Sequence, residues 1–518
     1  VTVTVTDDGT SNLSDSETFD IVVNEVNEAP VLNAIGDKTV DELSLLTFTA
    51  SATDADIPAN TLTFSLVGAP AGASINPSTG VFTWTPTEEQ GPDAYTFDVV
   101  VTDNGDPNLS DSETITVTVD EVESFLVKMG TFIKTTSTVP VTQVISGVGF
   151  KPKALILFTN AQLNQGLEDG YNFALGFSDG TNSRSIGVAS DDAIGQSNTG
   201  RAFGTKILRI LGTGDPSLSA QADLVTFHSD GFTLNWTQND FSPYIIHYIA
   251  IGGDDLTGAK VGNFVANTVE GNQSVTGVGF EPDFLMFMHA RATNLSGTSP
   301  HAYISYGFAK SPTQQGAIAV VSEDNRSTMD TWRWQRSDRA ILGLFPATGQ
   351  QDAEASLVSM DPDGFTINWI NALTNADRVY YLALKGGSYN VGSITQPTSL
   401  GTQDVAGVGF KPKAVILTSY GLAVGNTVNT NNRLSFGAAN DSNQGNAWVG
   451  DRDTGGTSIT ARSTDTTRII RMGNPAGTGS LSLVQAEAAM QSFEPDGFKL
   501  AWSKVDSVAR QLIYIAFG

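Results

Sequence analysis

The stretch GVGFKPKALIL, at Gly147–Leu157, reveals the organisation of the chain because it occurs three times. It returns as GVGFEPDFLMF from Gly277 and as GVGFKPKAVIL from Gly407, 130 residues further on each time. A later Asp-Gly-Phe sequence, first seen at Asp230, also recurs twice, at intervals of 133 residues. Several landmarks repeated at one period are typical of tandem domains. We therefore predict three related modules, over residues 124–253, 254–387 and 388–518.

Each module consists of short β-type runs. The run after each GVGF phrase is mainly apolar, which is typical of strands buried on both faces. These runs are Ala154–Phe158, Phe284–Met288 and Ala414–Leu417. Near the end of the first module, Phe232, Leu234 and Trp236 alternate with polar residues, as a strand requires. We predict an all-β fold in which the modules are tandem β-sandwiches of jelly-roll type, with Trp236 and its counterparts as packing residues.

The joins between modules, Gly253–Gly258 and Gly386–Ser388, are very short. We therefore expect neighbouring modules to pack closely, either as a compact threefold unit or as a string. Three segments differ most between modules, at residues 160–172, 291–301 and 421–432. We expect any ligand contacts in these segments, outside the shared core.

A second repeat occupies the N-terminal part of the chain. The text VTDDGTSNLSDSET from Val5 returns as VTDNGDPNLSDSET from Val101, a shift of 96 residues. Alternating apolar and polar runs between the copies predict a seven-stranded sandwich. Residues 29–123 are therefore expected to form one complete domain, and residues 1–28 the C-terminal end of a preceding repeat.

Acidic residues are concentrated in the same N-terminal part. Residues 1–124 hold 23 Asp or Glu and one basic residue, Lys38, and the whole chain has no cysteine. Such a charge excludes a nucleic-acid partner by repulsion, and carboxylates without basic neighbours suit hard divalent cations. The alternative is a solvated acidic surface. No apolar run approaches the length of a membrane span.

Three landmarks of this part resemble the calcium-binding motifs of bacterial cadherin-like repeats: EVNEAP from Glu25, ATDAD from Ala52 and VTD from Val101. The stretch GAPAGASINPSTGVFTWTP resembles the putative-immunoglobulin repeats related to that group. The resemblance implies a Ca²⁺ site, because six to eight oxygens must converge where two domains meet. The implied ligands are Glu25, Asn27, Glu28, Asp54, Asp56 and Asp103. Glu replaces the usual linker Asp at two places, which leaves the ligand count open.

The next linker, Asp120–Phe125, lacks the Asn and the Ala-Pro. A second calcium site there, with Glu42 as a helper, is therefore not expected. The three long modules share a Gly-x-Gly-Phe-x-Pro opening, a late Asp-Gly-Phe and a terminal Tyr-x-Ala. In this they loosely resemble β-sandwich modules of phage tail-fibre and bacterial surface proteins.

Catalytic chemistry finds little support in the chain. The four histidines, at 228, 247, 289 and 301, do not recur between modules, so we expect structural roles, with a His289–His301 pair as the alternative. The carboxylate pairs Asp191-Asp192 and Asp361/Asp363 are read as solvated turn acids, against a glycosidase alternative. Trp332 and Trp334 are read as core or interface, against a sugar-binding platform. We predict no catalytic or cofactor-binding residues.

These observations favour a non-enzymatic extracellular structural or adhesive protein. In this interpretation a calcium-stiffened stalk of repeats carries three β-sandwich modules at the cell surface, since linked weak contacts gain avidity. The expected partners are other copies of itself or surface proteins, and a glycan or cell-surface receptor. The alternatives are a phage virion fibre or capsid-surface protein, and the carbohydrate-binding part of a larger secreted enzyme.

Overall fold

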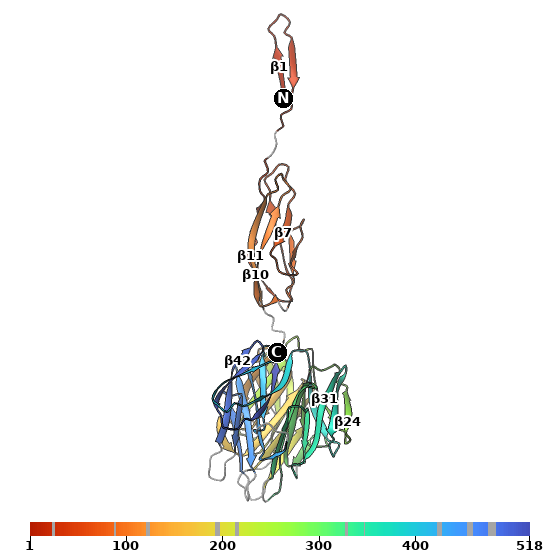
Figure 1. Cartoon of the computed structure of the whole chain (residues 1–518), viewed down its shortest axis with the longest axis vertical. Coiled ribbons are helices and arrows are strands. Elements are labelled where there is room, and N and C mark those ends of the chain that lie inside the picture. Colours follow the sequence, from red (N-terminus) through yellow and green to blue (C-terminus); the bar gives the residue numbers. More distant parts are fainter. Residues whose placement is uncertain are drawn as a thin grey trace. The chain divides into compact units, whose positions relative to one another are not determined.

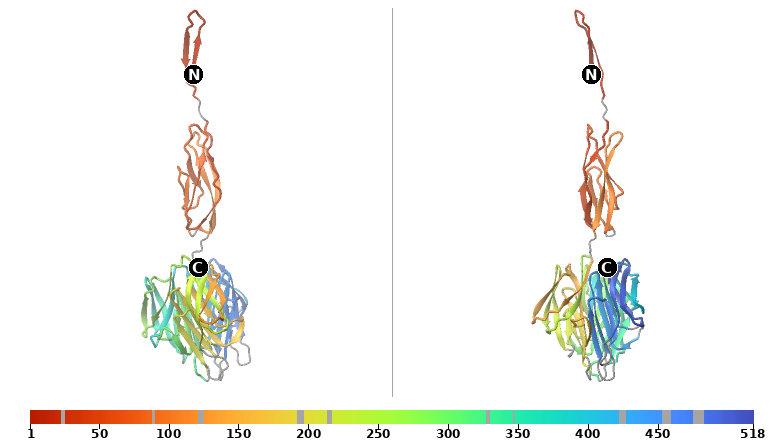
Figure 2. Two further views of the ribbon diagram at one scale, coloured as in Figure 1. Left: turned by 180° about the vertical axis from the view of Figure 1, so that it is seen from behind. Right: turned by 90° about the vertical axis from the view of Figure 1, so that its left-hand side faces the viewer.

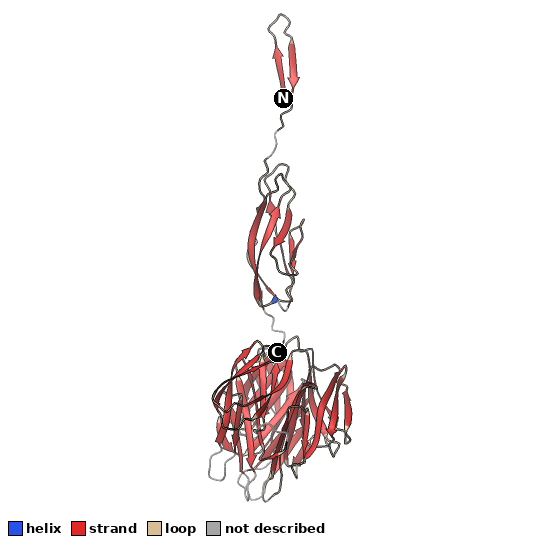
Figure 3. Ribbon diagram, in the orientation of Figure 1, coloured by secondary structure: helices blue, strands red, loops and turns tan. Residues whose placement is uncertain are grey.

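A computed structural model describes residues 1–22, 26–87, 90–120, 125–191, 197–212, 217–326, 330–345, 348–421, 427–452, 459–474 and 483–518. The chain divides into two compact units, Val1–Glu123 and Ser124–Gly518. Figure 1 colours unit 1 from red to orange and unit 2 from light orange through yellow and green to blue. Strands provide nearly all of the described secondary structure of both units, as Figure 3 shows. The predicted all-β fold is confirmed.

Unit 1 contains a sandwich of a four-stranded sheet, β4-β11-β10-β7, and a three-stranded sheet, β5-β9-β8, with a small β3-β6 pair. Its strands are β3 (Val31–Leu32), β4 (Lys38–Asp41), β5 (Leu46–Thr49), β6 (Ala52–Thr53), β7 (Thr63–Val67), β8 (Ser74–Ile75), β9 (Val81–Trp84), β10 (Asp93–Thr102) and β11 (Ser110–Asp120). Phe82, Trp84 and Val99 are among the residues buried between the sheets. The two sheets together supply the seven strands that the sequence predicts.

A separate hairpin precedes this sandwich, formed by β1 (Thr2–Thr6) and β2 (Ser14–Thr18). Its register pairs Val3 with Glu17, and the β10–β11 hairpin pairs Val99 with Glu113, 96 residues later. The local structure therefore repeats with the sequence. The surroundings differ, because Val3 is 56% exposed and Val99 is fully buried.

Unit 2 holds three repeats, and each contributes eleven of the described strands. The first comprises β12 (Leu126–Ile133), β13 (Val141–Ser146), β14 (Pro152–Thr159), β15 (Gly166–Asp169), β16 (Tyr171–Ser178), β17 (Ser183–Ser190), β18 (Thr199–Gly204), β19 (Leu208–Leu211), β20 (Leu218–His228), β21 (Gly231–Gln238) and β22 (Ile245–Gly252). The second comprises β23 (Gly258–Val265), β24 (Gly271–Thr276), β25 (Phe284–His289), β26 (Gly297–Pro300), β27 (Ala302–Ser311), β28 (Gln314–Ser322), β29 (Thr331–Arg336), β30 (Ile341–Leu344), β31 (Gln351–Asp361), β32 (Gly364–Asn371) and β33 (Arg378–Lys385). The third comprises β34 (Tyr389–Thr395), β35 (Gly401–Ala406), β36 (Ala414–Ser419), β37 (Asn429–Thr430), β38 (Arg433–Asn440), β39 (Gln444–Arg452), β40 (Ile459–Asp465), β41 (Ile470–Asn474), β42 (Leu483–Glu494), β43 (Gly497–Lys504) and β44 (Gln511–Phe517).

Each repeat is a sandwich of a seven-stranded and a four-stranded sheet. The four-stranded sheets, β13-β21-β20-β19, β24-β32-β31-β30 and β35-β43-β42-β41, each come from one repeat. The seven-stranded sheets, β12-β22-β14-β16-β17-β18-β26, β23-β33-β25-β27-β28-β29-β37 and β15-β40-β39-β38-β36-β44-β34, each include a strand from another repeat. The prediction of tandem β-sandwiches is confirmed.

The borrowed strands connect the repeats in a closed ring. The first repeat receives β26 from the second, the second receives β37 from the third, and the third receives β15 from the first. Each repeat thus gives one strand and accepts one strand. The three repeats lie beside one another in one compact body (Figure 2). This is the close packing that the short joins predict, although the individual module boundaries stay predictions.

The ring explains why strands such as β14 are apolar on both faces. Ile156 and Phe158 belong to a central core that contains side chains from all three repeats. Leu155 and Leu157, which alternate with them, belong to the core between the two sheets of the first repeat. Each repeat therefore has its own core and shares the central one.

The repeated GVGF and Asp-Gly-Phe phrases contact each other. In the first repeat, the carboxylate of Asp230 accepts hydrogen bonds from the backbone amides of Gly147, at 2.9 Å, and Gly149, at 2.7 Å. Asp363 and Asp496 accept the equivalent pairs in the other repeats. The Asp of each Asp-Gly-Phe turn therefore also closes the GVG loop of its repeat.

We expect Asp230→Asn to destabilise the folded state, because a carboxamide offers one acceptor oxygen where the carboxylate offers two. The hydrogen bonds from Gly147 and Gly149 hold the pKa of Asp230 below its ordinary value. Its contribution to stability is therefore present above the unfolded-state pKa and is lost as pH falls through the lower folded-state pKa. Thermal unfolding of wild type and variant between pH 2 and 7 measures this. Asp254→Asn, at an exposed acid, is the control, and equal melting temperatures for all three proteins would contradict the role.

Candidate functional site

Asn27 and Asp103, two of the predicted calcium ligands, are in direct contact. The Asn27 carboxamide donates a hydrogen bond to Asp103 Oδ2 at 3.0 Å. Asn60, which was not predicted, donates to Asn27 Oδ1 at 2.7 Å and to Asp56 Oδ2 at 2.6 Å. A chain of amides therefore connects Asn27, Asp103 and Asp56. Asn60 lies four residues beyond Asp56, and no carboxylate pattern marks it in the sequence.

Asp54 and Asp56 form the second part of this cluster. The backbone amide of Asp56 donates to Asp54 Oδ1 at 2.9 Å, and the amide of Glu28 donates to Asp56 Oδ1 at 3.1 Å. Asp56 is 5% exposed. Asp54 Oδ2 is buried without a hydrogen-bond partner. An unsatisfied buried carboxylate oxygen costs free energy, so this atom is suited to a cation or a donor that the described residues do not supply.

Asp103 is held in its ionised form. Burial raises the pKa of Asp103, but hydrogen bonds from the Leu109 amide, the Asn27 side chain and the Gly105 amide lower it below its ordinary value overall. Asp7, in the preceding hairpin, accepts the equivalent amides of Gly9 and Leu13. The turn is therefore a local property of the repeated sequence.

The predicted ligand set is brought together only in part. Asn27, Asp54, Asp56 and Asp103 converge, whereas the side chain of Glu28 is exposed and Glu25 lies outside the described residues. Among the residues that the structure describes, no three Asp, Glu, His or Cys side chains have the arrangement of a metal centre. The oxygen types suit Ca²⁺, but the described residues do not complete a site. In the next linker, Glu42 is buried and its amide bonds the Asp120 carbonyl at 3.0 Å, while residues 121–124 lie outside the described ranges.

In unit 2, the strands that accept a neighbour carry a repeated Thr-x-Arg sequence, for which no role was predicted. It occurs at Thr199–Arg201 in β18, Thr331–Arg333 in β29 and Thr460–Arg462 in β40. Each arginine holds the incoming segment. Arg201 donates to the Arg291 carbonyl at 3.0 Å, Arg333 to the Tyr420 carbonyl at 3.0 Å, and Arg462 to Glu168 Oε2 at 3.2 Å.

The segments 160–172, 291–301 and 421–432 contain β15, β26 and β37. These segments are therefore not only loops, because each supplies a strand to another repeat, and the expectation that they make the ligand contacts stays a prediction. Their pairing uses backbone groups, which any side chain can provide. Asn432 shows how tightly they join the repeats, since it is fully buried and donates to Tyr171 Oη at 3.0 Å and to Ser322 Oγ at 3.1 Å, in the first and second repeats.

The histidines lie in separate environments. His247 is fully buried, stacks on Phe158 and contacts Thr464 Oγ1 at 2.9 Å, and burial lowers its pKa to about 3. His289 lies beside Tyr303 and Asp377. His301 Nδ1 accepts the amide of Asp324 at 2.9 Å instead of contacting His289. Burial lowers the pKa of His289 and of His301 as well, which suits neutral structural groups.

The other sequence candidates have packing or turn roles. Trp334 is fully buried, and Trp332 packs against the same small core. Asp361 accepts hydroxyls of Ser359 and Thr366 at 2.7 Å each. Asp191 is not a solvated acid, because it is 6% exposed and accepts a bond from Asn198. Its neighbour Asp192 lies outside the described residues.

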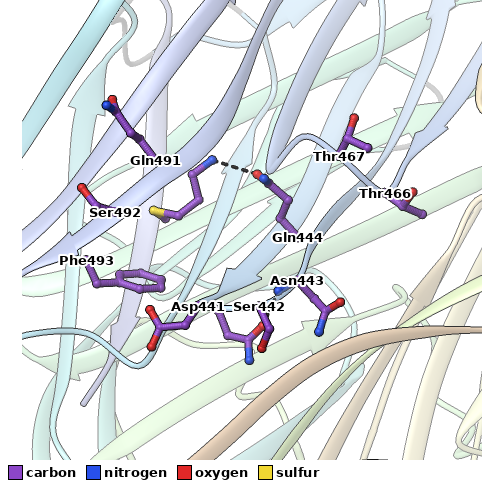
Figure 4. Close-up of a pocket in the computed structure, with 11 residues that line it drawn as sticks. Asp441, Ser442, Asn443, Gln444, Thr466, Thr467, Gln491, Ser492 and Phe493 are labelled. Atoms are coloured by element: carbon purple, nitrogen blue, oxygen red, sulfur yellow. Dashed lines mark hydrogen bonds between the residues drawn. The ribbon is translucent and has the colours of Figure 1, made fainter.

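A polar cavity of about 300 Å³ lies in the third repeat (Figure 4). Its lining groups are largely satisfied by the protein. Gln444 Oε1 accepts the Met490 amide at 2.8 Å, Gln491 accepts the Thr402 hydroxyl, and Ser442 accepts Lys128 of the first repeat. A second cavity, of about 440 Å³, is lined by Lys310, Tyr389 and Phe410, where the second and third repeats meet. A third is lined by residues of the first and second repeats and is described below.

Unit 2 has two unlike ends. Leu126 at the start of β12 pairs with Gly252 at the end of β22, so the unit begins and the joins between repeats lie at one end, here called the joining end. The C-terminus lies there too (Figure 1). The strands β14, β17, β19 and β21 run away from it and finish at the opposite end, here called the loop end. The second and third repeats have the same arrangement, with Gly258 paired with Lys385 and Tyr389 paired with Phe517, so all three repeats reach both ends.

Comparisons with known proteins bear on unit 1. Residues 29–120 match the family model described as "Putative Ig domain". Protocadherin Fat 4 of Mus musculus is 33% identical over 130 residues, which are 23% of this chain and 3% of that protein. The prediction of a cadherin/immunoglobulin-like repeat in this part of the chain is confirmed. The chain spans only a small fraction of that relative.

Solved structures resemble the chain only weakly. Protocadherin gamma C5 EC1-3 is 21% identical with a TM-score of 0.18, covering 23% of this chain and 42% of that one. The extracellular cadherin domains 1-4 of protocadherin gamma B7 are 20% identical with a TM-score of 0.21, covering 36% and 56%. A nucleoside hydrolase-related hypothetical protein from Saccharophagus degradans, associated with carbohydrate metabolism, has a TM-score of 0.16 at 20% identity, covering 18% and 26%. At these TM-scores the likenesses carry no argument.

We expect Arg333→Met to loosen the attachment of β37 to β29. The substitution leaves the Tyr420 carbonyl without its donor, which costs about 1–3 kcal/mol for a buried group. Hydrogen exchange should therefore accelerate at Asn429–Thr430, with a lower melting temperature. Lys411→Met, at an exposed position of the same repeat, is the control. Unchanged hydrogen exchange at β37 in Arg333→Met would show that the arginine does not hold this borrowed strand.

Proposed function

We propose that this is a non-enzymatic extracellular structural or adhesive protein, in which unit 2 is an attachment head. The cadherin/immunoglobulin-like repeat of unit 1 supports the extracellular, structural part of this proposal. Among the described residues, no helix has the length and apolar character needed to cross a membrane. The partners that suit the head are a glycan or receptor on another surface, or further copies of the same chain.

The observation that carries the proposal is the closed ring of three repeats with two unlike ends. The joining end carries the chain connections, so the loop end is the end left for contact. Three related but divergent repeats facing the same way can make three linked contacts. Linked weak contacts raise avidity without any new chemistry at a single site.

The absence of cysteine allows the two ends to be blocked selectively. Cysteines at Thr138, Thr268 and Thr398, exposed in the β12–β13, β23–β24 and β34–β35 connections, would place a polyethylene glycol maleimide at the loop end. Cysteines at Thr181, Thr313 and Asn443, all exposed tips of hairpins, would place it at the joining end. Binding of the full chain to cell monolayers, to bacterial cell-wall polysaccharide and to immobilised full chain is then measured by biolayer interferometry.

We expect modification at the loop end to abolish attachment and modification at the joining end to leave it intact. Dissociation should also be slower from dense than from sparse coatings, because linked contacts rebind. Attachment that survives blockage of the loop end, or the absence of attachment to every coating, would contradict the proposal.

We propose in addition that Ca²⁺ stiffens unit 1, held by Asn27, Asp54, Asp56 and Asp103 with Glu25 and Glu28 as further ligands. The support is the convergence of the first four side chains and the unpartnered Oδ2 of Asp54. A cation would relieve the repulsion between these carboxylates, which is roughly 3 kcal/mol for two charges about 5 Å apart near a protein surface.

We expect Ca²⁺ to slow hydrogen exchange of the full chain at residues 26–32 and 54–61. A ligand that binds only the folded state stabilises it by about 2.7 kcal/mol at a hundredfold excess over its Kd. The measurement compares EDTA, Mg²⁺ and Ca²⁺ at matched ionic strength. Asp54→Ala/Asp56→Ala should remove the response, and Asp20→Ala/Asp93→Ala, at two exposed acids, should keep it. An equal effect of Mg²⁺, Ca²⁺ and NaCl would favour a merely acidic surface.

A further inference from the structure

A cavity of about 380 Å³ lies where the second repeat of unit 2 meets the first. Phe203 of β18 borders it from the first repeat. From the second repeat it is lined by Arg291, Asn294, Asn375 and Asp377, among others. The volume lies in the range of about 300–1,000 Å³ that is usual for small-molecule sites.

Buried ionic groups with balanced charge adjoin this cavity. Arg291 forms an ion pair with Asp352, and its Nε lies 3.8 Å from Asp377 Oδ2. Arg201 adds a second guanidinium, which donates to three backbone carbonyls. His289 is neutral at physiological pH, because burial lowers its pKa. Two arginines therefore face two aspartates, and the site offers no net charge to an ionic ligand.

Asp377 presents an acceptor that the protein does not use. It lines the cavity and is 3% exposed. Its Oδ2 is enclosed beside its ion-pair partners, His289 Nε2 at 3.6 Å and Arg291 Nε at 3.8 Å, where a ligand does not reach it. Its Oδ1 accepts no hydrogen bond from a described residue, so this oxygen is the one that can accept a ligand hydroxyl.

The rim of the cavity supplies further groups that are free to bind. The side chains of Asn294, Asn375, Thr298 and Ser299 form no hydrogen bond with any described residue. Carboxamides and hydroxyls both donate and accept, as the hydroxyls of a sugar do. Phe203 adds an apolar face. The cavity of Figure 4 lacks this property, because its amides and hydroxyls already bond to one another and to neighbouring strands.

The cavity is also particular to the second repeat. The position of Asp377 is occupied by Tyr244 in the first repeat and by Arg510 in the third. Tyr244 bonds Asp240, and Arg510 pairs with Asp506, so both counterparts are satisfied within their own repeat. The acceptor left free at Asp377 is therefore a feature of one repeat and not of the shared fold.

We infer that this cavity binds a neutral sugar, with Asp377 accepting a hydroxyl and with Asn294 and Asn375 bonding its neighbours. The inference rests on the proposed attachment function and names a ligand class for it. The net neutrality of the buried cluster disfavours sulfated or sialylated ligands, since a charged group would lie in a site without a counter-ion.

The test uses the full chain and four neutral probes: the methyl glycosides of glucose, mannose and galactose, and N-acetylglucosamine. Sulfate and a sialylated trisaccharide form the charged arm. Saturation-transfer NMR detects binding, and calorimetry gives the Kd. We expect at least one neutral probe to bind, and Asn294→Ala and Asn375→Ala each to weaken it roughly tenfold, the loss of one hydrogen bond. Asn164→Ala, in the corresponding segment of the first repeat, should have no effect.

Asp377→Asn should also weaken binding, and its melting temperature reports whether the buried substitution folds. Binding of no neutral probe, binding of charged probes only, or binding unaffected by both Asn294→Ala and Asn375→Ala would overturn the inference. The attachment function is judged separately. If no neutral sugar binds but loop-end blockage still abolishes attachment, the head attaches through other contacts. If loop-end blockage leaves attachment intact, the proposed attachment function itself is wrong.

Discussion

The addition of one short strand from each repeat to the sheet of another is the interaction on which unit 2 depends. β26, β37 and β15 pair with β18, β29 and β40 through backbone hydrogen bonds. Successive repeats joined by such strand additions could form an open array, but here the third repeat accepts a strand from the first and the array closes into a ring. Closure satisfies the accepting edge in every repeat, and an unpaired edge is a liability that proteins otherwise have to protect.

The central core follows from the same closure. Each seven-stranded sheet is apolar on the face that the ring encloses as well as on the face toward its own four-stranded sheet. Ile156 and Leu155, adjacent in one strand, are both fully buried in different cores. A single repeat would expose the first of these faces to water, at roughly 25 cal/mol per Å² of apolar surface. The three repeats therefore form one compact body around a shared core.

Closure also separates the two ends and creates the junctions between repeats. The cavity beside Asp377 exists because the segment that delivers β26 crosses from the second repeat to the first. Its lining combines Phe203 of one repeat with Asn294 and Asn375 of the other, residues that no motif connects. In unit 1, by contrast, the turn at Asp103 is local, and its copy at Asp7 accepts the equivalent amide hydrogen bond.

The sequence by itself determined the features that depend on near neighbours and on periodicity. These are the three repeats, the alternation that buries Phe232 and Trp236, the strands that are apolar on both faces, and the immunoglobulin-like repeat with its Asp turns. Only the tertiary structure decided which repeat completes which sheet. β15, β26 and β37 read GLED, GTSP and NT, and they pair through backbone groups that every residue carries, so their side chains do not reveal the pairing. The sequence did not predict the bonds from Asn60 to Asn27 and to Asp56. It also did not predict the carboxylate that Asp377 presents to the cavity. Both depend on contacts between distant segments, which form only once the chain has folded.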